Sequence, residues 1–170
     1  MCAPWPVAAQ IDRGASSPVA FLVPPGLVEV ERGSRSLEEI AAGFPAPAEA
    51  AALLSSWGWI ANGYSNFAGR TASGTTSLEV SFHLFASPVG ATEAMSYYAA
   101  GRALMLGFSP VPIERVGDQI LATGGVRDVG NEVTIYVRSD AMLVRISVAS
   151  PYADPTADAL VIALAIASWA

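Results

Sequence analysis

The stretch NEVTIYVRSDAMLVRISVAS, residues 131–150, contains two runs in which valine and isoleucine alternate with polar residues. This period of two is typical of a strand with one apolar face. With Asp140 and Ala141 as the loop, apolar residues pair across the runs: Val137 with Val144, Ile135 with Ile146, and Val133 with Val148. Because pattern and register agree, the stretch predicts a β-hairpin. Its other face sets Tyr136 opposite Arg145, which predicts a cation–π pair.

A second hairpin is expected within residues 59–87, where apolar and polar residues again alternate around a turn-rich centre. In the register that sets Phe67 opposite Val80, His83 lies opposite Tyr64 on the polar face. We expect both hairpins to turn their apolar faces toward the longest helix and to leave His83 in solvent.

Four helices are expected around these strands, beginning after the capping box of Ser36 and Glu39, at Pro47, after Ser87 and after Asp154. The third helix, which runs to about Leu106, is the longest and is amphipathic. The last is apolar on almost every side over residues 160–167, which predicts burial all round or docking onto a partner chain. Short strands are expected at residues 26–33 and around Ile120. This order predicts an α+β fold, an antiparallel sheet of two hairpins plus a short strand packed by helices as an α/β sandwich.

Residues 1–25 hold five of the 12 prolines and predict a flexible leader, followed by one domain over residues 26–170. The opening residues Met1 and Cys2, followed by a Pro-rich segment, look like the mature end of a bacterial lipoprotein with lipid on Cys2. An ordinary, unmodified Cys2 is the alternative. No apolar run reaches the length of a transmembrane helix.

Composition excludes several classes of chemistry. The nine basic residues are all arginine, are scattered along the chain, and leave a formal net charge of −6, so nucleic-acid binding is not expected. The absence of lysine excludes Schiff-base chemistry and phosphate-loop motifs. One cysteine and one histidine cannot build a Cys/His zinc site, and no acidic run has calcium-loop spacing. We therefore expect no metal, no cofactor and no catalytic residue.

Two places are candidates for ligand binding. The first is the polar face of the second hairpin, where parity gathers five residues: Asn62, Tyr64, Asn66, Arg70 and His83. An ordinary solvated sheet face is the alternative interpretation. The second is the glycine-containing link over residues 107–130, where Arg127 or Arg115 has the charge to hold an anion.

The segment VGDQ (residues 116–119), the hairpin and the alanine-rich final helix resemble a broad group of bacterial extracytoplasmic lipoprotein domains. The group includes PsbP-like domains and the sensor domains outside some mycobacterial kinases. The resemblance covers about the last hundred residues and implies an antiparallel α/β sandwich with a binding or accessory role. The kinase sensors typically carry disulfides, which a chain with one cysteine cannot form internally.

Together these observations predict a non-enzymatic extracytoplasmic binding or sensor module for a small polar ligand or a protein partner. One alternative is a carrier of small apolar molecules, with Ala61, Gly63 and Ser65 lining a cavity between sheet and helix. Another is a structural subunit that forms a homodimer through residues 160–169. Membrane attachment is expected through Cys2 alone.

Overall fold

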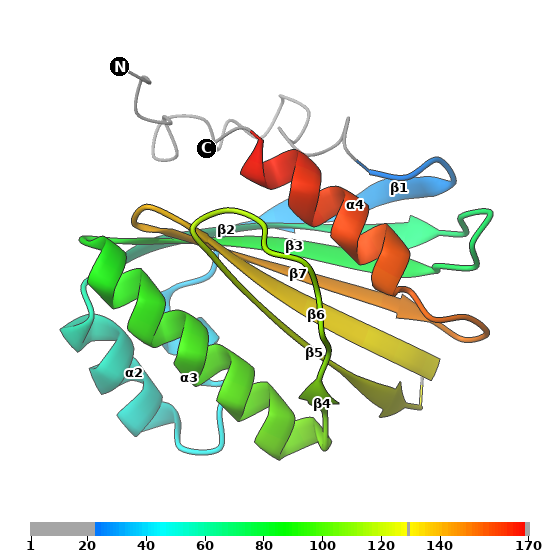
Figure 1. Cartoon of the computed structure of the whole chain (residues 1–170). Coiled ribbons are helices and arrows are strands. Elements are labelled where there is room, and N and C mark those ends of the chain that lie inside the picture. The colour runs from blue at the N-terminus through cyan, green and yellow to red at the C-terminus, as the bar shows by residue number, and fades with distance from the viewer. Residues whose placement is uncertain (1–22, 129, 169–170) are drawn as a thin grey trace.

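A seven-stranded antiparallel sheet forms the centre of the molecule (Figure 1). The computed structural model describes residues 23–128 and 130–168. The strands are β1 (Leu27–Gly33), β2 (Trp59–Gly69), β3 (Ser77–Phe85), β4 (Ser109–Pro110), β5 (Gln119–Arg127), β6 (Gly130–Ser139) and β7 (Met142–Ser150). Their order across the sheet is β1-β2-β3-β7-β6-β5-β4. The predicted fold class is confirmed; β5 is longer than the short strand expected around Ile120, and β4 was not expected.

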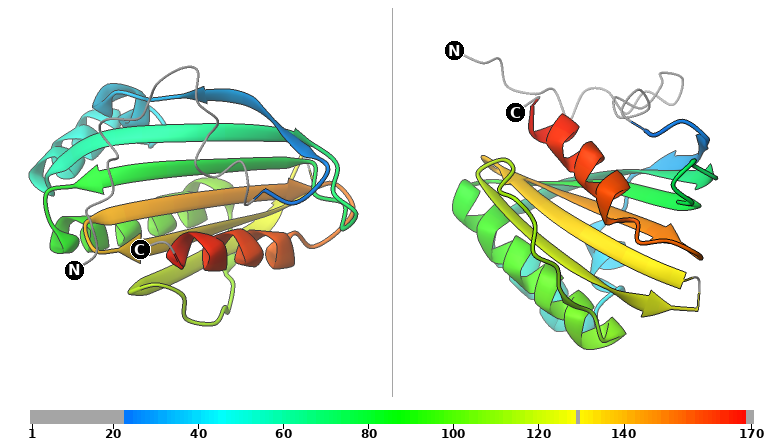
Figure 2. Two further views of the ribbon diagram at one scale, coloured as in Figure 1. Left: turned by 90° about the horizontal axis from the view of Figure 1, so that it is seen from above. Right: turned by 45° about the vertical axis from the view of Figure 1, so that its right-hand side comes forward.

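Four helices cover both faces of this sheet. They are α1 (Leu37–Ala41), α2 (Pro47–Ser56), α3 (Pro88–Leu106) and α4 (Thr156–Ala167). Helix α4 lies on one face, and α2 and α3 lie on the other (Figures 1 and 2). The Ser36–Glu39 capping box is present at α1, and the Ser87 hydroxyl accepts from the Gly90 N–H at the start of α3. These local signals place the helices where the sequence predicts them.

The β6–β7 hairpin has the predicted register: Val137 pairs with Val144, Ile135 with Ile146, and Val133 with Val148. These side chains are buried, but the helix they meet is α4 and not α3, because they share one apolar cluster with Ile162 and Ile166. The expectation that the hairpins face the longest helix is therefore wrong. Helices cover both faces of the sheet. The more apolar helix, α4, packs on the more apolar face.

The β2–β3 hairpin differs from the predicted register by two residues. Phe67 pairs with Leu78 instead of Val80, and His83 pairs with Asn62 instead of Tyr64. Parity is kept in an even shift, so each side chain stays on its predicted face. The difference arises in the connecting loop, where the Thr71 N–H donates to the Thr75 carbonyl and closes a tight turn.

His83 is buried, which corrects the expectation that it faces solvent. Only 1% of its surface is exposed, because α3 packs over the polar face of β3. Parity assigned His83 to the correct face, but the sequence did not show that this face carries a helix. A hairpin with one apolar and one polar face usually leaves the polar face in water, and here that rule fails.

Helix α4 buries one side only. Ala159, Ile162, Ala163 and Ile166 pack on the sheet, whereas Val161 and Leu164 are 57% and 51% exposed. The expectation of burial all round is therefore wrong for residues 156–168, and dimerisation through residues 160–169 stays a prediction. Just before the helix, Asp154 Oδ1 accepts from the Thr156 N–H at 2.9 Å, close to the expected cap.

A single carboxylate ties α4 to the β2–β3 loop. Asp158 Oδ2 accepts from the hydroxyls of Ser73 at 2.5 Å, Thr75 at 2.6 Å and Thr71 at 3.2 Å. One acceptor therefore satisfies three donors of a loop that has little apolar packing of its own.

Most of the predicted leader, residues 1–22, lies outside the described residues, and so do Cys2 and residues 169–170. Among the helices of the described ranges, none is both long and apolar enough to cross a membrane.

Candidate ligand-binding site

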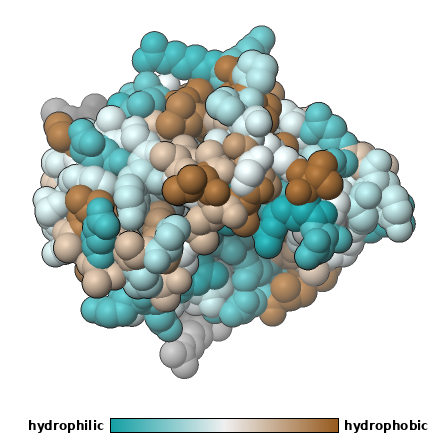
Figure 3. Space-filling model, turned by 90° about the horizontal axis from the view of Figure 1, so that it is seen from below, coloured by the Kyte–Doolittle hydropathy of each residue, from teal (hydrophilic) through white to brown (hydrophobic). Residues whose placement is uncertain are grey.

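A pocket of about 230 Å³ lies between α1, α3 and the face of the sheet that these helices cover. Its walls are polar on the sheet side and mixed on the helix side. Figure 3 views this side of the molecule, where hydrophilic residues lie in a hollow between hydrophobic ones. The lining residues are Arg35, Glu39, Ile40, Gly43, Phe44, His83, Tyr98, Gly101, Arg102, Met105, Leu106, Tyr136 and Arg145.

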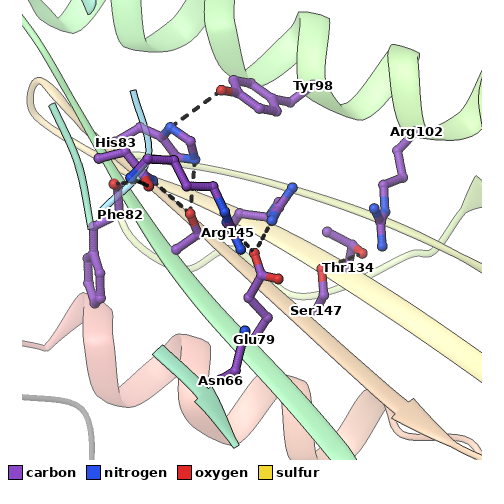
Figure 4. Close-up of polar contacts among 12 residues, drawn as sticks. Asn66, Glu79, Phe82, His83, Tyr98, Arg102, Thr134, Arg145 and Ser147 are labelled. Atoms are coloured by element: carbon purple, nitrogen blue, oxygen red, sulfur yellow. Dashed lines mark hydrogen bonds and ion pairs between the residues drawn. The ribbon is translucent and has the colours of Figure 1, made fainter. Parts of the chain in front are cut away.

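The sheet side of the pocket holds a chain of buried polar contacts around His83 (Figure 4). His83 Nε2 lies 3.2 Å from Ser81 Oγ, and His83 Nδ1 lies 3.4 Å from the Tyr98 hydroxyl. Asn62 Nδ2 donates to Ser81 Oγ at 2.9 Å. Burial, together with the charges of Arg145 and Arg35, lowers the pKa of His83 from 6.5 to about 3. The ring is therefore neutral at physiological pH.

Glu79 lies between two of the pocket arginines. Its Oε1 accepts from Arg145 Nη2 and, at 3.2 Å, from Arg35 Nη1. Burial favours the protonated carboxyl, but the charges of Arg145 and Arg35 outweigh it and hold the pKa of Glu79 below its ordinary value. The Arg35 guanidinium also lies 3.8 Å from the centre of the Tyr64 ring. The predicted pairing of Tyr136 with Arg145 is present in the register, but the Arg145 charge is directed to Glu79.

Glu132 forms a second bridge of the same kind. Glu132 is only 5% exposed. Its carboxylate pairs with Arg102 of α3 and, at 3.1 Å, with Arg127 at the end of β5. Two acidic side chains thus each serve two arginines on one side of the sheet. Four of the nine basic residues of the chain meet here.

Two of these arginines keep a donor without an acceptor. Four buried side-chain polar atoms in the described residues have no hydrogen-bond partner, and two of them are Nε of Arg102 and Nε of Arg145. Leaving a buried donor unpaired costs about 1–3 kcal/mol, and more when the group is charged. Both residues line the pocket, so an acceptor bound there would pair with these donors after a small shift of the two side chains.

The outer wall of the pocket is aromatic and fixed. Phe44, in the link between α1 and α2, stacks on Tyr97 with ring centres 4.9 Å apart and meets Tyr98 edge-on at 5.2 Å. Gly101 lets this ring come close, because a Cβ there would lie 3.2 Å from Phe44 Cε1. Trp57 packs edge-on against Tyr97 at 5.5 Å, so these aromatic residues fix the wall in place.

The residues predicted from the sequence fall into three places. Asn62 and His83 are buried beside the pocket. Tyr64 and Asn66 both donate to Glu31 at the exposed edge formed with β1, at 2.7 and 2.8 Å. Arg70 lies at the far end of β2, with its guanidinium 5.3 Å from the centre of the Tyr152 ring, and Arg127 joins the Glu132 bridge. They do not form one exposed binding surface.

Sequence reasoning missed the polar residues that line the pocket, Arg35, Tyr98, Arg102 and Arg145, and the two glutamates that pair with its arginines, Glu79 and Glu132. A signal was present for some of them. Tyr98 and Arg102 are four residues apart and share a helix face, and Glu79 has the same strand parity as His83. The sequence pattern does not show that α3 lies over the sheet face that carries His83 and Glu79.

The described residues offer no organised catalytic centre. Ser81 contacts His83 but is fully buried, and the other ring nitrogen of His83 faces the Tyr98 hydroxyl instead of a carboxylate. Within residues 23–128 and 130–168, no group of His, Cys, Asp and Glu could hold a metal ion. The small residues predicted to line a carrier cavity, Ala61, Gly63 and Ser65, pair with side chains of the α4 face and are not among those lining this pocket.

A solved structure shares the fold of this chain. The chain is similar to the extracellular domain of PknH from Mycobacterium tuberculosis, with a TM-score of 0.55 and 6% identity over 84% of this chain and 85% of that one. At this identity the likeness shows a shared fold. It agrees in part with the resemblance to kinase sensor domains. No protein-family model and no curated protein sequence match the chain.

Proposed function

We propose that this protein is a non-enzymatic extracytoplasmic binding or sensor module that holds a small polar ligand in the pocket between α1, α3 and the sheet. The observation that carries the proposal is that two arginines lining one pocket, Arg102 and Arg145, each have a buried Nε–H group without an acceptor. Binding sites commonly combine apolar walls with a few polar groups that fix the ligand, and this pocket has that composition.

A binding role fits the chemistry of the pocket better than catalysis does. The histidine is neutral and buried, and the two glutamates in the bridges are each held by two arginines. His83 and Glu79, whose pKa values both lie below their ordinary values, are not poised to exchange protons with a substrate near neutral pH. The charged network instead provides a rigid set of donors.

An extracytoplasmic location is part of the proposal. It is supported by the shared fold with an extracellular domain and by the lipoprotein-like start of the sequence. Lipid on Cys2 would attach the module to a membrane, and Cys2 lies outside the described residues. Mass spectrometry of the protein from its native membrane fraction tests this, because a diacylglycerol on the cysteine adds a defined mass.

The binding role is tested by a substitution that fills the entrance of the pocket with a larger side chain. Met105 lines the pocket and is 48% exposed, whereas its neighbour Leu104 is 82% exposed and does not line it. A library of small molecules is screened by native mass spectrometry against wild type, Met105→Trp and Leu104→Trp. We expect ligands that bind wild type and Leu104→Trp and lose about tenfold in affinity for Met105→Trp. Equal binding to all three proteins, or no ligand at all, contradicts the proposal.

A further inference from the structure

We infer, resting on the proposed binding role of this pocket, that its ligand is an organic monoanion: a carboxylate carried on a flat apolar group and held by Arg102 and Arg145. The carboxylate is inferred from the unpaired donors, the single charge from the charge balance, and the flat apolar group from the walls and the volume of the pocket.

The free donors favour an acceptor with negative character. The Nη2 atoms of Arg102 and Arg145 pair with Glu132 and Glu79, while both Nε–H groups are buried without a partner in the described part of the chain. Arg102 enters from α3 and Arg145 from β7, so the two guanidinium groups approach from different walls (Figure 4). A carboxylate offers two oxygens to such donors, and hydrogen bonds between charged partners are the stronger kind.

The charge balance favours a single negative charge. The arginines of the pocket and its bridges are Arg35, Arg102, Arg127 and Arg145, against the carboxylates of Glu39, Glu79 and Glu132. Glu31 also interacts electrostatically with Arg35, so four positive charges meet four negative ones and the network is close to neutral, in a chain whose formal net charge is −6. His83 adds no charge, because burial and the nearby Arg145 and Arg35 keep it neutral. A monoanion adds one negative charge to this network and a dianionic phosphate adds two, so burying the monoanion costs less free energy.

The walls and the volume favour a flat apolar body. Ile40, Phe44, Met105 and Leu106 line the pocket with apolar side chains. An apolar cavity of about 150 Å³ accepts a benzene molecule. The volume of about 230 Å³ therefore accommodates one ring together with its carboxylate.

The test compares probes that share a phenyl ring and differ in the charge of its substituent: benzoate, the neutral benzamide, phenylphosphonate at an alkaline pH where it is a dianion, and the cation benzylammonium. Affinities are measured by ligand-observed NMR or calorimetry on wild type, Arg102→Met, Arg145→Met and the control Arg115→Met. Arg115 is exposed, bonds the Asp118 carbonyl at 3.0 Å and does not line the pocket. We expect benzoate to bind wild type and Arg115→Met, with about tenfold losses for benzamide and for each pocket variant.

The outcomes separate this inference from the binding role itself. Benzamide or benzylammonium binding as well as benzoate, with affinity lost in Met105→Trp, overturns the anion inference and leaves the binding role intact. Phenylphosphonate binding more tightly than benzoate overturns the assignment of a single charge. Benzoate binding that is unchanged in Arg102→Met and Arg145→Met, or absent altogether, also overturns the inference. If a pocket variant fails to fold, the charge series on wild type still decides, because it needs no substitution.

Discussion

Nδ1 of His83 in β3 lies 3.4 Å from the hydroxyl of Tyr98 in α3, and both side chains are buried. The longest helix and the sheet thus meet through polar contacts as well as apolar ones, the pair of Arg102 with Glu132 being another. Because the same two residues line the pocket, their contact also fixes one side of the proposed binding site.

The burial of His83 predicts a specific pH dependence of stability. The pKa of the ring falls to about 3 in the folded protein, so below pH 6.5 the unfolded chain binds a proton that the folded chain does not. The free energy of unfolding must then decrease as pH falls, by about 1.4 kcal/mol between about pH 7.5 and about pH 5.5. Urea unfolding of wild type and His83→Gln at both pH values measures this. The variant should lack that part of the dependence, and equal slopes in the two proteins would contradict the prediction.

NMR gives an independent check on the same group. His83 is the one histidine of the chain, so its ring signals are unambiguous. They should not titrate between about pH 8 and about pH 5, because the pKa lies well below that range. A titration midpoint near the ordinary histidine value would show that the ring is solvated and that α3 does not cover it.

The Arg145–Glu79 pair should contribute to stability measurably. Both side chains are largely shielded, at 19% and 25% exposure, and Arg145→Met leaves Glu79 with Arg35 as its remaining partner. We expect a loss of about 2 kcal/mol in the free energy of unfolding and a favourable coupling to Glu79→Gln in a double-mutant cycle. The matched control is the pair of Arg138 with Asp118, whose carboxylate side is 54% exposed. Its coupling should stay below about 1 kcal/mol, and equal couplings for both pairs would count against a shielded network.

Asp158 should be important for the attachment of α4. Replacing it with alanine removes the acceptor for three loop hydroxyls, on Thr71, Ser73 and Thr75. We expect a loss of about 2 kcal/mol in the free energy of unfolding and faster amide exchange in the loop. Asp128→Ala, at an exposed position, serves as the control and should change stability by less than about 0.5 kcal/mol. An Asp158 variant as stable as this control would remove the proposed role.

Gly90 should not tolerate a side chain. A Cβ there would lie 1.9 Å from the Trp57 carbonyl oxygen, where the start of α3 passes close to the end of α2. Gly90→Ala therefore forces the backbone to move and should cost more than about 2 kcal/mol in the free energy of unfolding. Gly107→Asn is the control, because its φ of 67° suits asparagine and no atom lies within 4 Å of its Cβ position. Thermal unfolding of both variants measures this difference. A Gly90→Ala variant as stable as Gly107→Asn would contradict the prediction.

Comparison of the two hairpins shows how far the sequence could predict the fold. In β6–β7 the turn is short, so the valine and isoleucine pattern leaves one register that pairs apolar with apolar. In β2–β3 the longer loop permits even shifts that keep every side chain on its face, and the sequence pattern cannot choose between them. The observed choice depends on contacts made inside the loop and with Asp158.

The candidate site was less predictable for a related reason. Alternation identified the polar face that carries His83, but not the helix that turns this face into an interior. Arg102 and Arg145 are 43 positions apart in sequence and line one pocket only because α3 crosses the strands that carry Glu79 and Glu132. Such pairings depend on tertiary packing, which local periodicity does not encode.

The measurement that tests the central claim most directly is an NMR titration that follows the ring signals of His83 while benzoate, and then any ligand found by screening, is added. His83 lines the pocket and has no counterpart elsewhere in the chain, so it reports on that site alone. We predict saturable shifts of these signals that disappear in Met105→Trp and persist in Leu104→Trp. Saturable binding that leaves the His83 signals unmoved would contradict the assignment of the binding site to this pocket.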